Sequence, residues 1–150
     1  ETDIKWGYDH GIVNAEVPVK NAERIVLKGK YTTLELELSF RTQNEPDEIS
    51  QILSDLCDEY KNTADSITNR KWLFVTLSWL WSNLDEYEDP LGEVENIYAA
   101  FNYPENIDDF IRYMPPSDGY DPSKHTQLEN TSRLLDNWRR YLEIESAVFK

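Results

Sequence analysis

Hydrophobic residues recur at helical spacing along most of the chain. The clearest repeat follows Pro46, where apolar side chains return every three or four positions and acidic residues fill the other faces. Its members are Ile49, Ile52, Leu53, Leu56, Cys57 and Tyr60. The next segment, 66–83, is apolar on more than one face, so we expect a central helix with neighbours on more than one side. Where Trp79 and Leu80 are buried in it, truncating either to alanine should cost ~2–5 kcal/mol.

Start and stop signals define two helices before this repeat. The segment 3–9 predicts a short opening helix that ends before Gly11. A second helix is expected over about 15–28, with Asn14 as its cap and Gly29 as its stop.

The segment 32–40 fits two kinds of structure. Its apolar residues alternate with polar ones, which is the period of a strand: Leu34, Leu36, Leu38 and Phe40. Thr32 and Glu35, however, have the spacing of a helical capping box, and no partner strand is evident. We favour a helix and keep the strand as the alternative.

Proline and capping residues divide the second half of the chain. Asp89 followed by Pro90 predicts the start of a helix, and Pro104 is expected to begin a shorter one. The segment 114–122 is rich in proline and predicts a loop. Ser123 is expected to cap the last helix, whose apolar face comprises Leu128, Thr131, Leu135, Trp138 and Leu142.

These elements predict an all-α fold, a single irregular bundle of about seven or eight helices that forms one domain over residues 1–150. Five Trp, nine Tyr and five Phe supply bulk for its core. The lone cysteine cannot form an internal disulfide, and no secretory signal or membrane-length apolar run is visible. We therefore expect a cytoplasmic protein.

Charge is distributed unevenly. The chain has 29 acidic and 15 basic residues and a net charge of −14, which disfavours nucleic acid or an anionic membrane as a direct ligand and favours a basic protein partner. Residues 85–121 alone hold 11 acids and a single base, Arg112. We expect Arg112 to pair with Asp108 or Asp109, one turn earlier.

Tyrosines are interleaved with these acids. Tyr98 is in step with Leu91, Val94 and Phe101 and is expected to be in the core. Tyr87, Tyr103 and Tyr120 fall in turns, where a rigid amphipathic ring suits an interface, and a role in the core is the alternative. The expected partner-binding residues are Asp85, Glu86, Tyr87, Glu88, Glu93, Tyr103, Glu105, Asp108, Asp109, Asp118, Tyr120 and Asp121.

No established catalytic or cofactor motif is found. His10 and His125 are isolated, and Cys57 lies on an apolar stripe, so we expect surface or cap roles for the histidines and a core role for the cysteine. The carboxylate runs 85–89 and 108–109 are candidates for hydrolysis or metal binding. The first run lacks the spacing of a calcium loop. We therefore expect no enzymatic activity, no cofactor and no metal, and a carboxylate-based hydrolase is the least favoured alternative.

Several motifs in the second half resemble a bacterial family known as domain of unknown function 2247. They are Trp79-Leu80-Trp81, the runs 85–91, 93–99 and 101–105, and Phe110-Ile111-Arg112-Tyr113-Met114-Pro115. The resemblance implies a small cytosolic bacterial protein, similar to immunity proteins of polymorphic or contact-dependent toxin systems, which occupy a toxin domain and silence it. It implies no catalytic residues. We therefore expect an immunity-type inhibitor of a basic toxin domain, such as a nuclease. The alternative is a regulatory or adaptor protein that binds another basic partner.

Overall fold

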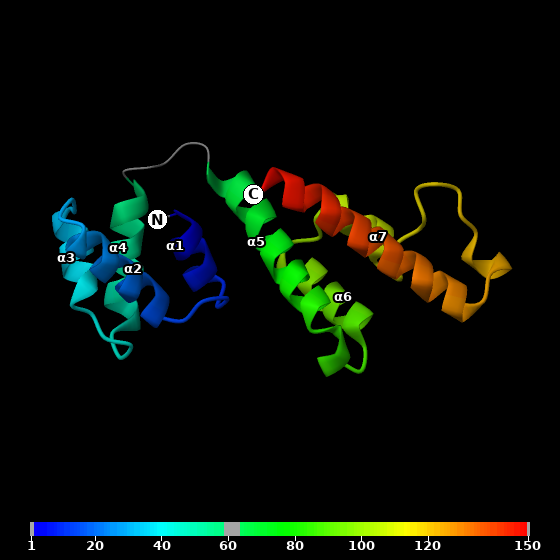
Figure 1. The fold of residues 1–150 in the computed structure, drawn as a ribbon, viewed down its shortest axis with the longest axis horizontal. Helices are drawn as coiled ribbons and strands as arrows, with labels where there is room; N and C mark the ends of the chain where they lie inside the picture. The colour runs from blue at the N-terminus through cyan, green and yellow to red at the C-terminus, as the bar shows by residue number, and fades with distance from the viewer. Residues whose placement is uncertain (1, 59–63, 150) are drawn as a thin grey trace. The chain divides into compact units, whose positions relative to one another are not determined.

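The computed structural model describes residues 2–58 and 64–149, and these residues form α-helices and 3₁₀ helices without a strand (Figure 1). The all-α class is therefore confirmed. Tyr60 lies outside the described residues. The chain divides into two compact units, residues 1–72 and 73–150, and the division falls within helix α5. That residues 1–150 form one domain stays a prediction.

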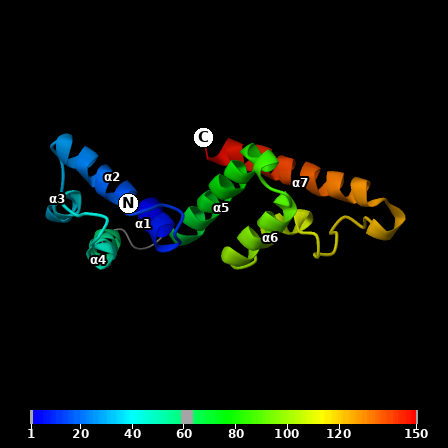
Figure 2. The same ribbon diagram turned by 90° about the horizontal axis from the view of Figure 1, so that it is seen from below.

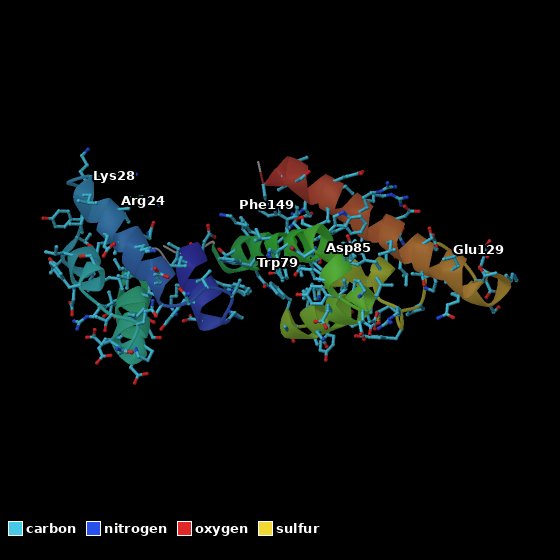
Figure 3. All side chains as sticks on the ribbon, turned by 60° about the horizontal axis from the view of Figure 1, so that its bottom comes forward. Arg24, Lys28, Trp79, Asp85, Glu129 and Phe149 are labelled. Atoms are coloured by element: carbon cyan, nitrogen blue, oxygen red, sulfur yellow. The ribbon has the colours of Figure 1, made fainter. Side chains whose placement is uncertain are left out.

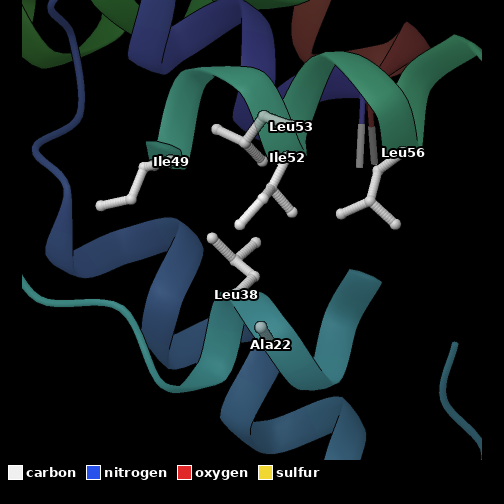
Figure 4. Close-up of a cluster of buried hydrophobic side chains, with 6 residues drawn as sticks. All are labelled: Ala22, Leu38, Ile49, Ile52, Leu53 and Leu56. Carbon is white, nitrogen blue, oxygen red and sulfur yellow. The ribbon is translucent and has the colours of Figure 1, made fainter. Parts of the chain in front are cut away.

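The first unit contains α1 (Thr2–Asp9), α2 (Glu16–Leu27), α3 (Thr33–Ser39), α4 (Pro46–Asp58) and the beginning of α5 (Ala64–Ser82). Its core forms where α2, α3 and α4 meet, because each turns its apolar stripe inward (Figure 4). The six buried residues of this core are Ala22, Leu38, Ile49, Ile52, Leu53 and Leu56. Cys57 is also buried, as expected from its position on the stripe.

Segment 32–40 is helical, and Thr32 and Glu35 cap its N-terminus by bonding to each other's backbone N–H group. The backbone N–H of Glu35 donates to Thr32 Oγ1 at 3.3 Å, and the Thr32 N–H donates to Glu35 Oε2 at 2.6 Å. This capping box satisfies two backbone donors that a helix end leaves open. The helix buries Leu38 and leaves Phe40 76% exposed just past its end.

A close approach fixes the start of α5 against α1. The indole of Trp72 donates from Nε1 to the Asp3 carbonyl at 2.8 Å, and its ring covers Gly7. A Cβ at Gly7 would lie 2.5 Å from Trp72 Cζ2, so only glycine fits beneath this ring. Lys71 adds an ion pair with the Asp3 carboxylate.

The second unit contains the rest of α5 and five further helices: η1 (Leu84–Glu86), α6 (Pro90–Ala100), η2 (Glu105–Phe110), η3 (Pro122–Lys124) and α7 (Gln127–Val148) (Figure 2). Aromatic rings pack these elements together. Phe110 of η2 stacks 6.3 Å from the fully buried Trp138 of α7, and Trp81 of α5 meets the same indole at 4.9 Å. The large rings fill the space between these elements.

Two sequence predictions about the last helix are wrong. Thr126, and not Ser123, caps α7, since its side chain accepts from the Glu129 N–H and Glu129 reaches back to the Thr126 N–H. Ser123 instead lies within η3, where Asp121 binds its N–H and hydroxyl. Because the helix starts later, Leu128 falls in its first turn and is 80% exposed.

Helix α5 buries one stripe of its apolar surface in the second unit. Leu73, Leu77 and Leu80 are each no more than 2% exposed and lie on one helical face. Trp79 is 55% exposed and Val75 is 42% exposed, so the condition of burial is met by Leu80 and not by Trp79.

Candidate functional site

Acidic residues follow an exposed tryptophan where α5 ends. Asn83 closes the helix by donating from Nδ2 to the Trp79 carbonyl at 2.7 Å, and η1 follows. The exposed Trp79 ring meets Tyr87 edge to face, with centroids 6.3 Å apart (Trp79 and Asp85 are labelled in Figure 3). The neighbouring acids are exposed, and their side chains make no hydrogen bond or ion pair within the described part of the chain. We call this set the η1 patch: Trp79, Asp85, Glu86, Tyr87 and Glu88.

A Schellman motif at the end of α6 displays Tyr103. The Tyr103 N–H donates to the Tyr98 carbonyl at 2.9 Å and the Asn102 N–H donates to the Ala99 carbonyl at 3.1 Å. Both Asn102 and Tyr103 have left-handed backbones, with φ of 61° and 57°. The ring of Tyr103 packs edge to face on Tyr98 at 5.2 Å, which is the side-chain contact typical of this motif, and remains 58% exposed.

Three tyrosine rings gather around this turn. Tyr98 is buried, as predicted, and its hydroxyl donates to Asp108 Oδ1 at 2.6 Å, which raises the pKa of Tyr98 to about 12. Tyr113 lies 6.3 Å from Tyr98 and is 60% exposed. Partial desolvation, and then the charge of Glu95, raise the pKa of Tyr113. We call Tyr98, Tyr103 and Tyr113 the tyrosine cluster.

Arg112 does not pair with Asp108 or Asp109. Its Nε and Nη2 donate to the two oxygens of Glu95 at 2.7 and 2.9 Å, and Nη1 donates to Asp89 Oδ1 at 3.1 Å. The prediction fails because η2 ends before Arg112, at an extended Ile111, so helical spacing no longer applies. The hydrogen bonds that Arg112 donates to Glu95 raise the pKa of Arg112.

Asp89 links this arginine to the start of α6. Its Oδ1 accepts from the Gly92 N–H at 3.1 Å, so it caps the helix as predicted. This backbone hydrogen bond, and then Arg112, lower the pKa of Asp89.

Acids later in the segment brace the turn before α7. Asp118 binds Arg133 through both oxygens at 2.9 Å, and the Arg133 guanidinium lies 4.4 Å from the centre of the Tyr120 ring. His125 stacks on Tyr120 at 4.5 Å. Asp118 and Tyr120 also line an open depression of mixed charge, together with Arg140 and neighbouring residues of α7.

The expected partner-binding residues thus fall into groups. Asp85, Glu86, Tyr87 and Glu88 form the η1 patch, and Tyr103, Glu105 and Asp108 lie at the tyrosine cluster. Asp109, Asp118, Tyr120 and Asp121 make contacts within the turn before α7 or with α7 itself. Glu93 accepts from Asn96 on α6.

Trp79 and Tyr113 are exposed rings that the sequence pattern did not predict. Trp79 gave no signal, since it stands among apolar residues on α5. The exposure of Tyr113 had a signal in the sequence, because this tyrosine lies within the acidic segment 85–121 and close to the proline-rich loop.

Among the described residues, no three His, Cys, Asp or Glu side chains are grouped so that they could hold a metal ion. Both histidines contact aromatic rings, His10 on Trp6 at 3.7 Å and His125 on Tyr120. Within the same part of the chain, no helix has the length and apolar content to cross a bilayer. The absence of a cofactor stays a prediction.

Comparison with known families places nearly the whole chain in a bacterial family. The model of a family described as an uncharacterized protein conserved in bacteria, DUF2247, matches residues 2–146. No curated protein and no solved structure matches the chain.

Proposed function

The chain belongs to the bacterial family DUF2247, and we propose that it is an immunity-type inhibitor that binds a basic toxin domain and performs no chemistry of its own. The immunity role comes from the resemblance described above. The binding role is supported by the chain's own surface.

The η1 patch is the observation that carries this proposal. Asp85, Glu86 and Glu88 are exposed without an internal partner in the described residues, and Tyr87, which lies among them in the sequence, contacts an indole that is 55% exposed. Unpaired carboxylates attract a basic partner and speed its approach. Tryptophan and tyrosine are enriched among the residues that contribute most to binding free energy. In the η1 patch, the carboxylates would therefore attract a basic partner, and the Trp79 and Tyr87 rings would supply the contacts that hold it.

The electrostatics favour binding over catalysis. General acids need a raised pKa, which a carboxylate gains by burial or by a second carboxylate nearby. The carboxyl pKa values that depart from their ordinary range in the described residues are all lowered, at Glu45, Asp89, Asp118, Asp121 and Glu129. Hydrogen-bond donors, from the backbone or from side chains, are the largest cause in each case. Such carboxylates stay ionised and suit structural and electrostatic roles.

A toxin that cleaves nucleic acid offers a matching surface, because it needs positive charge to hold phosphates. An acidic protein that covers this charge excludes the substrate without any reaction. We therefore expect competition between this protein and nucleic acid for the same toxin surface.

The proposal is tested with the product of the gene directly upstream, where a toxin that this protein neutralises would be encoded. Co-expression of the wild-type protein should restore growth to cells that produce the toxin. The double variant Glu86→Lys/Glu88→Lys should associate at least tenfold more slowly with the purified toxin domain, since rim charges act mainly on association rate.

A matched control separates position from net charge. The variant Glu23→Lys/Glu143→Lys makes the same change in net charge at two other exposed glutamates whose side chains form no ion pair among the described residues. It should associate much faster than the η1 patch variant. Equal rates for the two variants would show that the η1 patch is only a solvated face. An upstream product that neither arrests growth nor binds would contradict the immunity role.

A further inference from the structure

Two exposed tyrosine rings stand at the end of α6 and after η2. Tyr103 and Tyr113 are 58% and 60% exposed, and both contact the buried ring of Tyr98. Two exposed rings that share one buried neighbour form an aromatic surface open to a partner, and tyrosine is enriched among the residues that contribute most to binding.

The position of Tyr103 is fixed by the backbone. Two successive non-glycine residues, Asn102 and Tyr103, adopt left-handed φ values, which is unfavourable for a bulky residue. The Schellman hydrogen bonds and Pro104 hold this conformation. The ring therefore loses little conformational freedom on binding.

Carboxylates lie within electrostatic reach of these rings. Asp108 accepts from the hydroxyl of Tyr98, the ring that both exposed tyrosines contact, and Glu105 follows Tyr103 by two residues at the start of η2. Glu105 is exposed, and its side chain makes no hydrogen bond or ion pair in the part of the chain that is described. Arg112, the one base of this segment, is bound by Glu95 and Asp89.

Another part of this chain shows how a guanidinium binds to a tyrosine ring and a carboxylate together. Arg133 lies 4.4 Å from the centre of the Tyr120 ring while Asp118 binds its nitrogen at 2.9 Å. A planar guanidinium stacks on an aromatic face and forms a forked hydrogen bond with a carboxylate. Tyr103, Tyr113 and Glu105 provide the same chemical groups, yet no cation of the described residues lies over either ring.

We propose that Tyr103, Tyr113 and Glu105 form a recognition site for an arginine side chain of the basic protein partner. This inference rests on the proposed function, since it assumes a basic partner. It adds that the partner residue recognised at this site is an arginine. The η1 patch and this site would then act differently: the patch through charge, and the site through the faces of its two rings.

The experiment uses fluorescently labelled hexa-arginine as the probe and measures its Kd for the full chain by anisotropy at low salt. The variant Tyr103→Leu/Tyr113→Leu keeps the net charge and removes both rings. Two exposed cation–π contacts correspond to a loss of roughly five- to thirty-fold in affinity. The variant Tyr103→Phe/Tyr113→Phe keeps the ring faces and should stay within about threefold of wild type. Tyr31→Leu, which removes a 47% exposed tyrosine of the first unit, is the control and should bind as wild type does.

The outcomes separate this inference from the proposed function. Wild-type affinity in the Leu variant, together with a loss in the Glu86→Lys/Glu88→Lys variant, would overturn the arginine site and leave the acidic surface standing. An equal loss in the Phe and Leu variants would also overturn it, because the ring face would then not be what is recognised. Circular dichroism checks that each variant is folded. If the double Leu variant unfolds, the single variant Tyr113→Leu takes its place, because it leaves the contact between Tyr103 and Tyr98 intact. Wild-type affinity in Tyr113→Leu would then remove the Tyr113 ring from the arginine site.

Discussion

At the scale of single residues, several side chains act through partners that are close in sequence. Asn102 and Tyr103 adopt left-handed backbones without glycine, at a cost of about 1–3 kcal/mol each. The two Schellman hydrogen bonds and the contact between Tyr103 and Tyr98 offset that cost. The result is a defined ring position at the surface, which a glycine turn would not supply.

The hydroxyl of Tyr98 gives a measurable signature of this arrangement. Its hydrogen bond to Asp108 favours the neutral phenol, so the pKa of Tyr98 is raised to about 12. A raised pKa in the folded state means that the associated stability is complete below the unfolded value of about 10 and is lost as the pH rises towards 12. Ultraviolet titration should show a late-ionising tyrosine that is missing in Tyr98→Phe. A wild-type titration without this late component would contradict the hydrogen bond.

At the scale of elements, α5 shows why composition alone does not place a helix. Its second-unit part buries Leu73, Leu77 and Leu80 and leaves Trp79 exposed, although all four are strongly apolar. The exposed indole packs edge to face with Tyr87, the residue that follows η1. Burial here depends on which neighbours cover each face.

Substitutions at two adjacent positions on α5 should therefore lower the free energy of unfolding by different amounts. Leu80→Ala should lower the free energy of unfolding by ~2–5 kcal/mol, because it leaves a cavity. Trp79→Ala should lower it by no more than about 2 kcal/mol, since about half of the ring is already in water. Urea unfolding measures both changes.

Binding should reverse that order. Trp79→Ala should raise the dissociation rate of the toxin complex, because truncating an aromatic anchor costs about 2 kcal/mol or more. Folded Leu80→Ala should bind as wild type does. A Trp79→Ala complex with the wild-type lifetime would remove Trp79 from the interface.

At the scale of the whole molecule, fewer carboxylates of the acidic segment are free of an internal partner than the sequence suggests. The segment 85–121 holds 11 acids, but many of them bind donors within the chain. These engaged acids are Asp89, Glu93, Glu95, Asp108, Asp109, Asp118 and Asp121. Four others remain without a side-chain partner in the described residues: Asp85, Glu86, Glu88 and Glu105. We therefore expect the position of each carboxylate, and not only the net charge, to govern binding of a basic partner.

The net charge of −14 should nevertheless act at a distance. We expect the association rate with the basic partner to fall by at least tenfold between about 0.02 and 0.5 M salt, because the Debye length shrinks over this range. The dissociation rate should change much less. Stopped-flow kinetics at several ionic strengths measure both rates, and an association rate that is flat with salt would contradict steering by charge.

The sequence alone was enough for features that depend on neighbours within one helical turn. The capping box of Thr32 with Glu35 and the cap of Asp89 at α6 could be found in this way. The buried stripe of α4 followed equally from its spacing. Such features need only local backbone geometry and the tendency of apolar side chains to leave water, and both are encoded in a short window.

Tertiary structure decided the contacts between residues that are far apart in sequence. The pairing of Arg112 with Glu95, 17 positions away, depends on how the chain turns after η2. The pairing of Asp118 with Arg133 depends on where α7 begins, and the exposure of Trp79 depends on which face of α5 is covered. Spacing in the sequence cannot reveal these contacts, because they arise only once packing has brought distant elements together and fixed which surfaces remain in water.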